Sequence, residues 1–420
     1  MRLNVTSEIG RLKSVLVHLP GREIDMMVPP MMAQLLFDDI LYGQVAREEH
    51  RRFQQLLRFI ATDVLDIQDL LEETLEDEDV KELIVRDLAQ RNGFSRRLMT
   101  WLLAQNTSVL AEVLIGGIAK EQESGELPKF ELMPVPNYFF MRDPQIVLGD
   151  GVIISSMATQ ARRREALLSR YVFQHHKSFR GRDLFWVDFM ESAPAKPKKG
   201  GATIEGGDVL VPRRDLLLIG VTERTNKASV QQIARTLKKS NSAVRTIIVV
   251  ELPKQRSFMH LDTVFTITNR HECLIYPPVI LPRGSQAAKV TRIDLTKRSI
   301  SFLPEKSLLG ALKKQGLDLE PIYCGGKAVV DQQREQWTDG ANAFTLAPGI
   351  VLLYERNVRT AEELNANGYH IVYEDDLLLG RTELETWTDK KYALQIQGNE
   401  LSRARGGPRC MTMPLEREDV

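Results

Sequence analysis

The chain has 420 residues, of which 43% are hydrophobic and 7% aromatic, and this length allows two domains or one large domain with an insertion. Lysine plus arginine and aspartate plus glutamate number 56 each, so nothing in the balance of charge indicates a surface for nucleic acid or for an anionic membrane. The composition is that of an ordinary globular protein and favours a small molecule as the ligand.

The N-terminal residues lack the apolar core of a signal peptide, and no apolar run reaches the length of a membrane span. We therefore expect a cytoplasmic protein with no membrane partner. The first predicted element is a strand in residues 12–21, which Pro20 and Gly21 end. Asp38 and Asp39 follow beside apolar residues, and we interpret them as a helix start rather than the lip of a ligand site.

A charge-rich stretch from about residue 45 to residue 117 has the periodicity of α-helices. Apolar residues recur at helical spacing in two stripes, which are Phe53, Leu56, Leu57 and Ile60, and then Val80, Leu83, Ile84 and Leu88. Ser95 is the predicted cap of a third helix, and a fourth follows it. We predict an inserted helical subdomain over residues 45–117, with its apolar residues in a core rather than in a cofactor site.

From Pro134 onward, short strands alternate with helices of about ten residues. The predicted strands cover residues 152–155, 216–220, 245–250, 264–267, 273–276 and 350–354, and two predicted helices cover 229–237 and 307–315. Thr360 begins a capping box for a third helix, with Gly368 as its end. Residues 194–201 interrupt these units, and we interpret them as a connector rather than a lid. The recurrence predicts an α/β domain over residues 1–44 and 118–420.

Three short segments of this α/β region carry ionisable groups beside glycine, proline or a predicted strand. Asp143 follows two aromatic residues and precedes a proline, and Glu205 and Asp208 flank two glycines. Residues 260–265 alternate like a strand, which would place His260 and Asp262 on one face. Each segment alone has an ordinary explanation as a turn, a loop or a satisfied polar contact. Together they form a consistent set for chemistry on a cation.

Cys410 lies on a glycine-rich turn flanked by Arg405 and Arg409. Two guanidinium groups and free backbone N–H groups would favour the thiolate, so we expect Cys410 to be a nucleophile rather than a buried apolar residue. The other cysteines are Cys273 and Cys324, and their wide spacing predicts neither a zinc site nor a redox pair.

A cysteine, a histidine and at least two carboxylates are the smallest set for attack on a guanidinium group. This group is planar, carries five N–H donors and is matched best by carboxylates. A thiolate is able to attack its carbon, and a histidine is able to protonate the departing ammonia and then take a proton from water. The carboxylates would hold the cation through both steps.

In this order the motifs resemble those of the arginine deiminases, a family of guanidino-group-modifying enzymes. The matching segments are residues 7–16, 35–39, 140–144, 205–208, 260–265, 324–326, 334–342 and 410–414. The resemblance implies that Cys410 is the nucleophile and His260 the general acid and base. It also implies that Glu205 and Asp262 complete the catalytic set, and that Asp143 joins Asp262 in binding the substrate guanidinium.

The resemblance further implies a substrate pocket lined by Asn137 and Phe140. It places Arg162, Arg224 and Arg405 at the substrate α-carboxylate or at the pocket mouth. The expected reaction converts L-arginine and water to L-citrulline and ammonia, with no metal and no organic cofactor. The alternatives are a related hydrolase acting on agmatine or methylated arginine, and an inactive arginine-binding regulator.

The fold implied by the resemblance is a five-bladed, pseudo-symmetric α/β propeller with a helical-bundle insertion. Residues 1–44 and 118–420 would form the catalytic propeller, and we expect the chain to assemble as a homo-oligomer. The sequence departs from the family pattern at Met141, where threonine is common, and at Pro408 and Arg409 before the cysteine.

Overall fold

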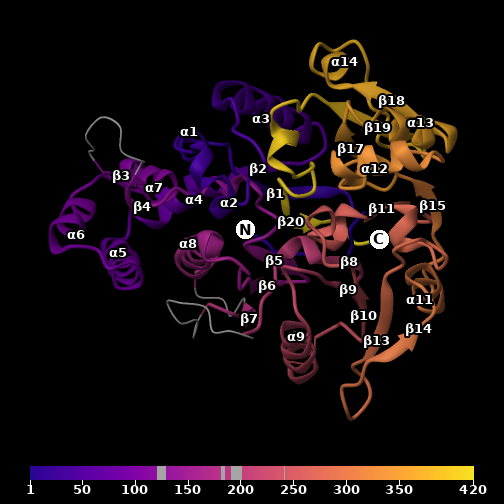
Figure 1. The fold of residues 1–420 in the computed structure, drawn as a ribbon, viewed down its shortest axis with the longest axis horizontal. Helices are drawn as coiled ribbons and strands as arrows, with labels where there is room; N and C mark the ends of the chain where they lie inside the picture. Colours follow the sequence, from indigo (N-terminus) through magenta and orange to yellow (C-terminus); the bar gives the residue numbers. More distant parts are fainter. Residues whose placement is uncertain (121–128, 181–184, 191–200, 241) are drawn as a thin grey trace.

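The computed structural model describes residues 1–120, 129–180, 185–190, 201–240 and 242–420. The predicted connector at residues 194–201 therefore lies, except for its last residue, outside the described residues. Figure 1 shows a mixed α/β molecule in which small sheets and their helices surround the middle of the view, where both chain ends lie. In the described parts of the chain, no helix has both the length and the apolar character of a membrane-spanning segment.

The described residues form six sheets, of which five have at least three strands. The first sheet has the order β2 (Asp63–Asp66), β1 (Leu12–Val17), β20 (Met413–Arg417), and the second has the order β5 (Gln145–Leu148), β6 (Gly151–Ile154), β7 (Phe185–Asp188). The third sheet has the order β14 (Leu303–Glu305), β13 (Lys289–Asp294), β10 (Thr246–Glu251), β9 (Leu216–Val221), β8 (Val209–Arg213).

The fourth sheet has the order β11 (Phe265–Asn269), β12 (Glu272–Ile275), β15 (Glu320–Tyr323). The fifth has the order β16 (Phe344–Ala347), β17 (Ile350–Tyr354), β19 (Lys391–Ile396), β18 (Tyr369–Tyr373), and a two-stranded ribbon joins β3 (Ile118–Ala119) to β4 (Phe130–Leu132). The six strands predicted after Pro134 are confirmed as β6, β9, β10, β11, β12 and β17, with boundaries shifted by at most two residues, and the strand predicted in residues 12–21 is confirmed as β1.

Strands β9, β10 and β17 are apolar and buried along nearly their whole length, which is typical of strands covered on both faces of a sheet. Strands β9 and β10 pair in parallel, with Leu218 opposite Ile248, and α9 (Lys227–Lys239) connects them. Helix α9 buries its apolar stripe, and the Asn226 side chain accepts hydrogen bonds from the first backbone N–H groups of the helix. The predicted helix at residues 229–237 is thus confirmed.

The helix-rich stretch near the N-terminus is only partly separate from the sheets. It contains α3 (Gly43–Leu57), α4 (Ile67–Thr74), α5 (Glu78–Asn92), α6 (Arg96–Leu103) and α7 (Thr107–Gly116). Strand β2 interrupts these helices and pairs in parallel with β1, while α5 and α6 extend away from the sheets (Figure 1). Part of residues 45–117 therefore belongs to the first sheet, and the division into two domains stays a prediction.

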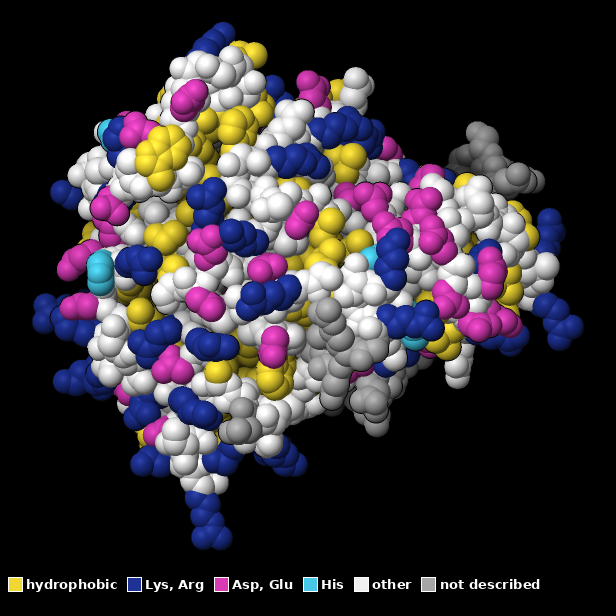
Figure 2. Space-filling view, turned by 180° about the vertical axis from the view of Figure 1, so that it is seen from behind, with side chains coloured by type: hydrophobic (Ala, Val, Ile, Leu, Met, Phe, Trp, Pro, Cys, Tyr) yellow, Lys and Arg dark blue, Asp and Glu magenta, His cyan; other side chains and the backbone are white. Residues whose placement is uncertain are grey.

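Short helices fill the remaining connections between strands. They are α1 (Arg22–Asp25), α2 (Met32–Leu35), α8 (Arg163–His175), α10 (Pro277–Ile280), α11 (Leu308–Lys314), α12 (Val329–Trp337), α13 (Val358–Ala366) and α14 (Glu374–Leu378). On the face shown in Figure 2, basic and acidic side chains are mixed over most of the surface, and acidic ones gather toward the end that carries α4 to α6.

Two predicted helix starts are wrong. Asp38 and Asp39 do not cap a helix, because α3 begins at Gly43; they form ion pairs with Arg256 and Arg403 instead. At α13 the sequence predicted a capping box that begins at Thr360.

Thr360 lies inside α13, whose first N–H groups are satisfied from outside the helix. The carboxylate of Glu335 accepts hydrogen bonds from the backbone N–H groups of Arg359 and Thr360, both at 2.7 Å. A cap supplied from a distant part of the chain leaves no local signal.

A buried histidine links β1 to the start of α4. His18 is fully buried, and its Nδ1 lies 3.1 Å from Asp66 Oδ1 and its Nε2 lies 3.3 Å from Glu23 Oε1. Burial alone would lower the pKa of His18, but Asp66 and Glu23 raise it to about 10. Asp66 also accepts the N–H of Gln68 as the cap of α4, so the charged imidazole holds the two elements together.

We expect His18→Gln to lower the free energy of unfolding by about 3 kcal/mol, because two buried carboxylates lose their cation. The folded-state pKa of His18 exceeds its ordinary 6.5, so its contribution is complete below pH 6.5 and is lost as the pH rises through about 10. Denaturant unfolding should therefore show a large difference in unfolding free energy between the parent and His18→Gln just below pH 6.5. Just above pH 10 the difference should be small. A difference that is the same at both pH values would contradict this role.

Candidate active site

A small enclosed pocket brings together eight of the ten predicted site residues. Its free volume is about 20 Å³, on the order of one water molecule, so an amino acid enters only if lining side chains move. The lining residues are Leu36, Asn137, Phe140, Asp143, Arg162, Arg224, Met259, His260, Thr263, Ala404, Arg405 and Cys410. The other two predicted residues, Glu205 and Asp262, lie behind this lining and act on His260 and Cys410.

Asp143 is held at the pocket by hydrogen bonds to both of its carboxylate oxygens. Its Oδ1 accepts the N–H of Gly207 at 3.0 Å, and its Oδ2 accepts Nη1 of Arg162 at 2.8 Å. Nδ1 of His260 lies 3.7 Å from Oδ1 of the same carboxylate. Asp143 therefore carries a fixed negative charge between an arginine and the imidazole.

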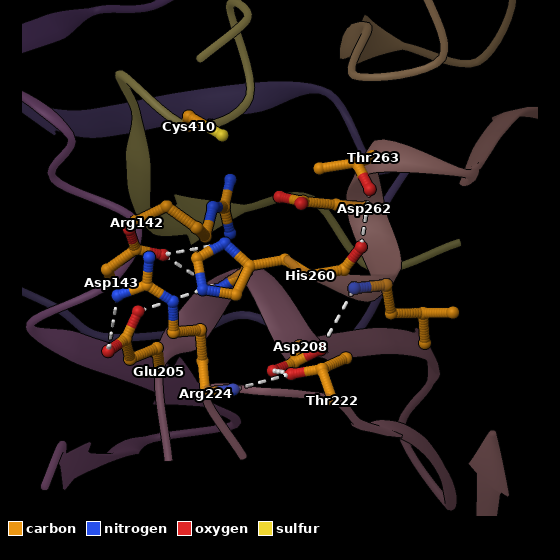
Figure 3. Close-up of polar contacts among 12 residues, drawn as sticks. Arg142, Asp143, Glu205, Asp208, Thr222, Arg224, His260, Asp262, Thr263 and Cys410 are labelled. Atoms are coloured by element: carbon orange, nitrogen blue, oxygen red, sulfur yellow. Dashed lines mark hydrogen bonds and ion pairs between the residues drawn. The ribbon is translucent and has the colours of Figure 1, made fainter. Parts of the chain in front are cut away.

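His260 is held from its other side by Glu205. Glu205 Oε2 lies 2.9 Å from His260 Nε2, and both side chains are buried (Figure 3). Burial alone would lower the pKa of His260, but Asp143 and Glu205 raise it to about 9. Burial alone would raise the pKa of Glu205, and the contacts with His260, Arg224 and Arg162 hold it well below its usual range. The pair is therefore imidazolium and carboxylate near neutral pH.

The segment that carries His260 is not the predicted strand. Residues Leu261–Thr263 form a turn of 3-10 helix, and strand β11 begins only at Phe265. Asp208 Oδ1 fixes this turn by accepting the N–H of Leu261 at 2.9 Å. A Cβ atom at Gly207 would lie 2.5 Å from Nδ1 of His260, so glycine is needed for the close approach.

Asp262 pairs with Arg409, on the turn that carries the cysteine. Its Oδ2 accepts Nη1 of Arg409 at 2.7 Å, while its Oδ1 is buried without a hydrogen-bond partner. Burial raises the pKa of Asp262, and Arg409 opposes that effect. The free oxygen is an acceptor available to a ligand that carries N–H groups.

Cys410 and His260 both line the pocket, as the proposed chemistry requires. The backbone N–H of Cys410 donates to Asn342 Oδ1 at 3.1 Å, and its carbonyl accepts the N–H of Arg142 at 3.0 Å. A Cβ atom at Gly406 would lie 2.2 Å from the ring of Phe140, so this turn also depends on glycine.

The expected activation of Cys410 by its flanking arginines is wrong. Burial raises the pKa of the thiol well above its usual value, and Asp262, Asp143 and Asp339 add to that rise. The guanidinium of Arg409 forms ion pairs with Asp262 and Glu8, and that of Arg405 stacks on Trp337. The protein alone therefore keeps Cys410 as a thiol.

The three predicted carboxylate-binding arginines differ in how far they are already paired. Nη1 of Arg162 lies 2.8 Å from Asp143 and 3.6 Å from Glu205, and its Nη2 lies 2.9 Å from Glu165. Nη1 of Arg224 is buried without a hydrogen-bond partner, as are Nε and Nη1 of Arg405. Arg224 and Arg405 therefore keep free donors.

Among the described residues, the oxygen and nitrogen atoms of Asp143, Glu205 and His260 lie close enough to one another to hold a metal ion. Arg162 already brings a positive charge to both carboxylates, and the imidazole is protonated. This charge distribution opposes a second cation at that point, so the group suits ion pairing better than metal binding.

Some residues of the site escaped the sequence analysis. Asn342 links the two halves of the pocket, since its side chain accepts the N–H of Cys410 and donates to the carbonyl of Asp262. Asn342 ended a segment that matched the family pattern, but no role was assigned to it. Arg409 was noticed beside the cysteine, but its partner Glu8 is 401 positions away and could not be identified.

Comparisons with known proteins identify relatives of this chain in fold and in sequence. The solved structure of SxtG, an amidinotransferase from Microseira wollei, superposes with a TM-score of 0.52 at 13% identity, covering 100% of this chain and 98% of that chain. The molecule thus shares its mixed α/β fold with that structure.

The family model "Arginine deiminase" matches residues 33–417. The arginine deiminase of Clostridium perfringens is 35% identical, with 100% of this chain and 98% of that protein covered. That of Bacillus cytotoxicus is 33% identical, with 100% and 99% covered. The chain belongs to the arginine deiminase family.

Proposed function

We propose that the protein hydrolyses free L-arginine to L-citrulline and ammonia through a covalent intermediate on Cys410. The observation that carries this proposal is the pocket in which a thiol, an imidazolium and a buried carboxylate converge, with three arginine side chains in its lining and Asp262 behind it. These groups match the two charged ends of L-arginine, since carboxylates accept from a guanidinium and arginines donate to a carboxylate.

Substrate binding exchanges partners within the pocket. The substrate guanidinium takes the place of Arg162 on Asp143 and donates to the free Oδ1 of Asp262. The substrate carboxylate draws Arg162 toward itself, and Arg224 supplies its Nη1, which has no hydrogen-bond partner and lies 3.9 Å from Glu205 Oε1.

The bound cation activates the thiol. The carboxylates of Asp262 and Asp143 raise the pKa of Cys410, and a guanidinium paired with them removes much of that effect. The thiol proton leaves to water, and the thiolate adds to the guanidinium carbon. The imidazolium of His260 then protonates the departing nitrogen, the C–N bond breaks and ammonia leaves.

The second half of the reaction uses the same imidazole as a base. Neutral His260 takes a proton from a water molecule, and the resulting hydroxide adds to the amidino carbon. The C–S bond breaks and the hydroxyl proton of the adduct passes to water, which releases L-citrulline with a neutral ureido group and regenerates the thiolate of Cys410. Glu205 stabilises each imidazolium state through its short contact with Nε2.

We expect Arg224→Ala to raise the KM for L-arginine about 10- to 100-fold, because a charge-assisted hydrogen bond contributes about 1.5–3 kcal/mol. kcat should change less, since Arg224 does not meet the reacting atoms. Steady-state citrulline formation measures both constants. Arg381→Ala is the control, because Arg381 is exposed and pairs with Asp376. An unchanged KM in Arg224→Ala would remove this residue from the carboxylate site.

The direct test of the proposed function is citrulline release by the purified protein from L-arginine, agmatine and a methylated arginine. Preference for L-arginine supports the proposal. Faster turnover of agmatine would favour a related hydrolase. Arginine side chains that bind a substrate α-carboxylate would then be unnecessary, because agmatine lacks this group. Binding of L-arginine without release of citrulline would favour a regulator, and a small electrophile that fails to label Cys410 would support that reading.

We also infer a five-bladed propeller as the finer description of the fold. Asp143, Glu205, His260, Asn342 and Cys410 each lie shortly before an edge strand of a different sheet, namely β5, β8, β11, β16 and β20. Five equivalent loops that meet at one pocket are what a pseudo-fivefold arrangement produces. The inserted helical subdomain, the homo-oligomer and the cytoplasmic location stay predictions.

A further inference from the structure

The hydroxyl of a buried tyrosine reaches the turn that carries the nucleophile. Tyr354 is the last residue of β17 and is only 1% exposed, and its hydroxyl donates to the carbonyl oxygen of Gly406 at 2.8 Å. The ring lies against Gly398, where a Cβ atom would come within 2.2 Å of it. Packing therefore sets the place of this hydroxyl, and its hydrogen bond holds the peptide that joins Gly406 to Gly407.

The peptide between the two glycines is closely enclosed. A Cβ atom at Gly406 would meet the ring of Phe140, and one at Gly407 would lie 2.6 Å from the carbonyl oxygen of Asn342. The described chain has no cis peptide bond, so this peptide is trans. In a planar trans peptide the C=O and the N–H point in opposite directions. Because Tyr354 holds the carbonyl of Gly406, it also sets the direction of the N–H of Gly407.

The N–H of Gly407 is directed at the sulfur by a single helix-like turn. The carbonyl of Gly407 accepts the N–H of Met411 at 3.3 Å, as at the start of a helix. Cys410 follows Gly407 by three residues, and in a capping box the side chain at this spacing reaches back to the first N–H. Burial and Asp262 raise the pKa of the Cys410 thiol, and the hydrogen bond from the N–H of Gly407 opposes that rise.

We propose that Tyr354 is a positioning residue that aligns the N–H of Gly407 with the Cys410 sulfur and so stabilises the thiolate that attacks the substrate. The inference rests on the proposed function, because it concerns the nucleophile of that reaction. A hydrogen bond to a thiolate is stronger than one to a thiol, so this contact strengthens when the thiol loses its proton beside the bound cation. The same N–H is in place again when the C–S bond breaks and the thiolate returns.

The variant that tests this role is Tyr354→Phe, which keeps the ring and removes only the donor. The carbonyl of Gly406 then loses its partner, and the N–H of Gly407 is no longer held against the sulfur. The acid limb of the pH profile of kcat reports ionisation of the thiol in the substrate complex, and we expect it to rise by about one pH unit. The alkaline limb, which reports His260, should stay in place.

Alkylation of Cys410 by iodoacetamide measures the same effect without turnover. Only the thiolate reacts, and a thiol whose pKa rises by about one unit reacts about threefold more slowly at a fixed pH, because its greater nucleophilicity offsets part of the lost thiolate. Mass spectrometry separates this label from any on Cys273 or Cys324. In Cys410→Ala protein, Tyr354→Phe should leave the affinity for L-arginine, measured by calorimetry, unchanged.

Tyr369→Phe is the matched control. Tyr369 is fully buried in the same sheet, its hydroxyl donates to Glu272 at 3.0 Å, and neither residue lines the pocket. This variant should lose stability in thermal unfolding without a change in the acid limb or in the alkylation rate. Replacement of Tyr354 by 4-aminophenylalanine restores an N–H donor at the same place, so it should return both measurements to their parental values.

An acid limb and an alkylation rate that stay parental in Tyr354→Phe would overturn the proposal. So would an equal shift in Tyr369→Phe, an equal loss of L-arginine affinity in Cys410→Ala protein, or failure of 4-aminophenylalanine to restore the parental behaviour. Absence of citrulline from the parent protein would instead contradict the proposed function. The alkylation rates would then still test whether Tyr354 acts on the sulfur, since they need no turnover.

Discussion

Cys410→Ser protein is expected to form citrulline at least about 10⁴-fold more slowly than the parent while it still binds L-arginine. Serine is nearly isosteric, but its hydroxyl is a far weaker nucleophile, and His260 is protonated and unable to act as its base near neutral pH. The pocket contacts that hold the substrate do not involve the sulfur. Single-turnover citrulline assays and calorimetry measure the two properties independently.

The matched control for this experiment is Cys273→Ser. Cys273 is fully buried in β12, away from the pocket, and burial keeps it a thiol. This variant should lose some stability and retain citrulline formation. If Cys410→Ser kept the parental rate, the covalent mechanism would be wrong, whatever the behaviour of Cys273→Ser.

The second large effect is expected for Glu205→Gln, which should lower kcat by about 10²- to 10⁴-fold. Glu205 is one of the charges that raise the pKa of His260 to about 9, so its removal lowers that pKa. The protonated form of His260, which is needed to expel ammonia, is then lost at a lower pH than in the parent protein. The alkaline limb of the pH profile of kcat/KM should therefore move toward neutral pH.

Glu165→Gln is the matched control for Glu205→Gln. Glu165 is also buried and pairs with Arg162, but the structure gives it no contact with His260. We expect the alkaline limb of this variant to stay in place. Thermal unfolding of both variants shows whether the protein remains folded. An alkaline limb that shifts equally in both would mean that general electrostatics, and not the Glu205 contact, controls the imidazole.

Local sequence patterns predicted the elements that depend on neighbouring residues. The apolar stripe of α9 and the apolar runs of β9 and β10 form the core as expected, because burial of a helical face or a strand follows from spacing. The same rule failed at residues 260–265, where alternation resembled a strand. There Asp208, from another part of the chain, holds Leu261 in a 3-10 turn.

What the sequence by itself determined is the chemical inventory: one cysteine on a glycine-rich turn, one histidine and several carboxylates in the order of a known family. The tertiary structure alone decided their states. It keeps Cys410 a thiol, makes His260 a cation and leaves Asp262 Oδ1 and Asp339 Oδ2 without partners. The physical reason is that a pKa depends on burial and on charges brought from distant positions, neither of which is encoded in a local motif.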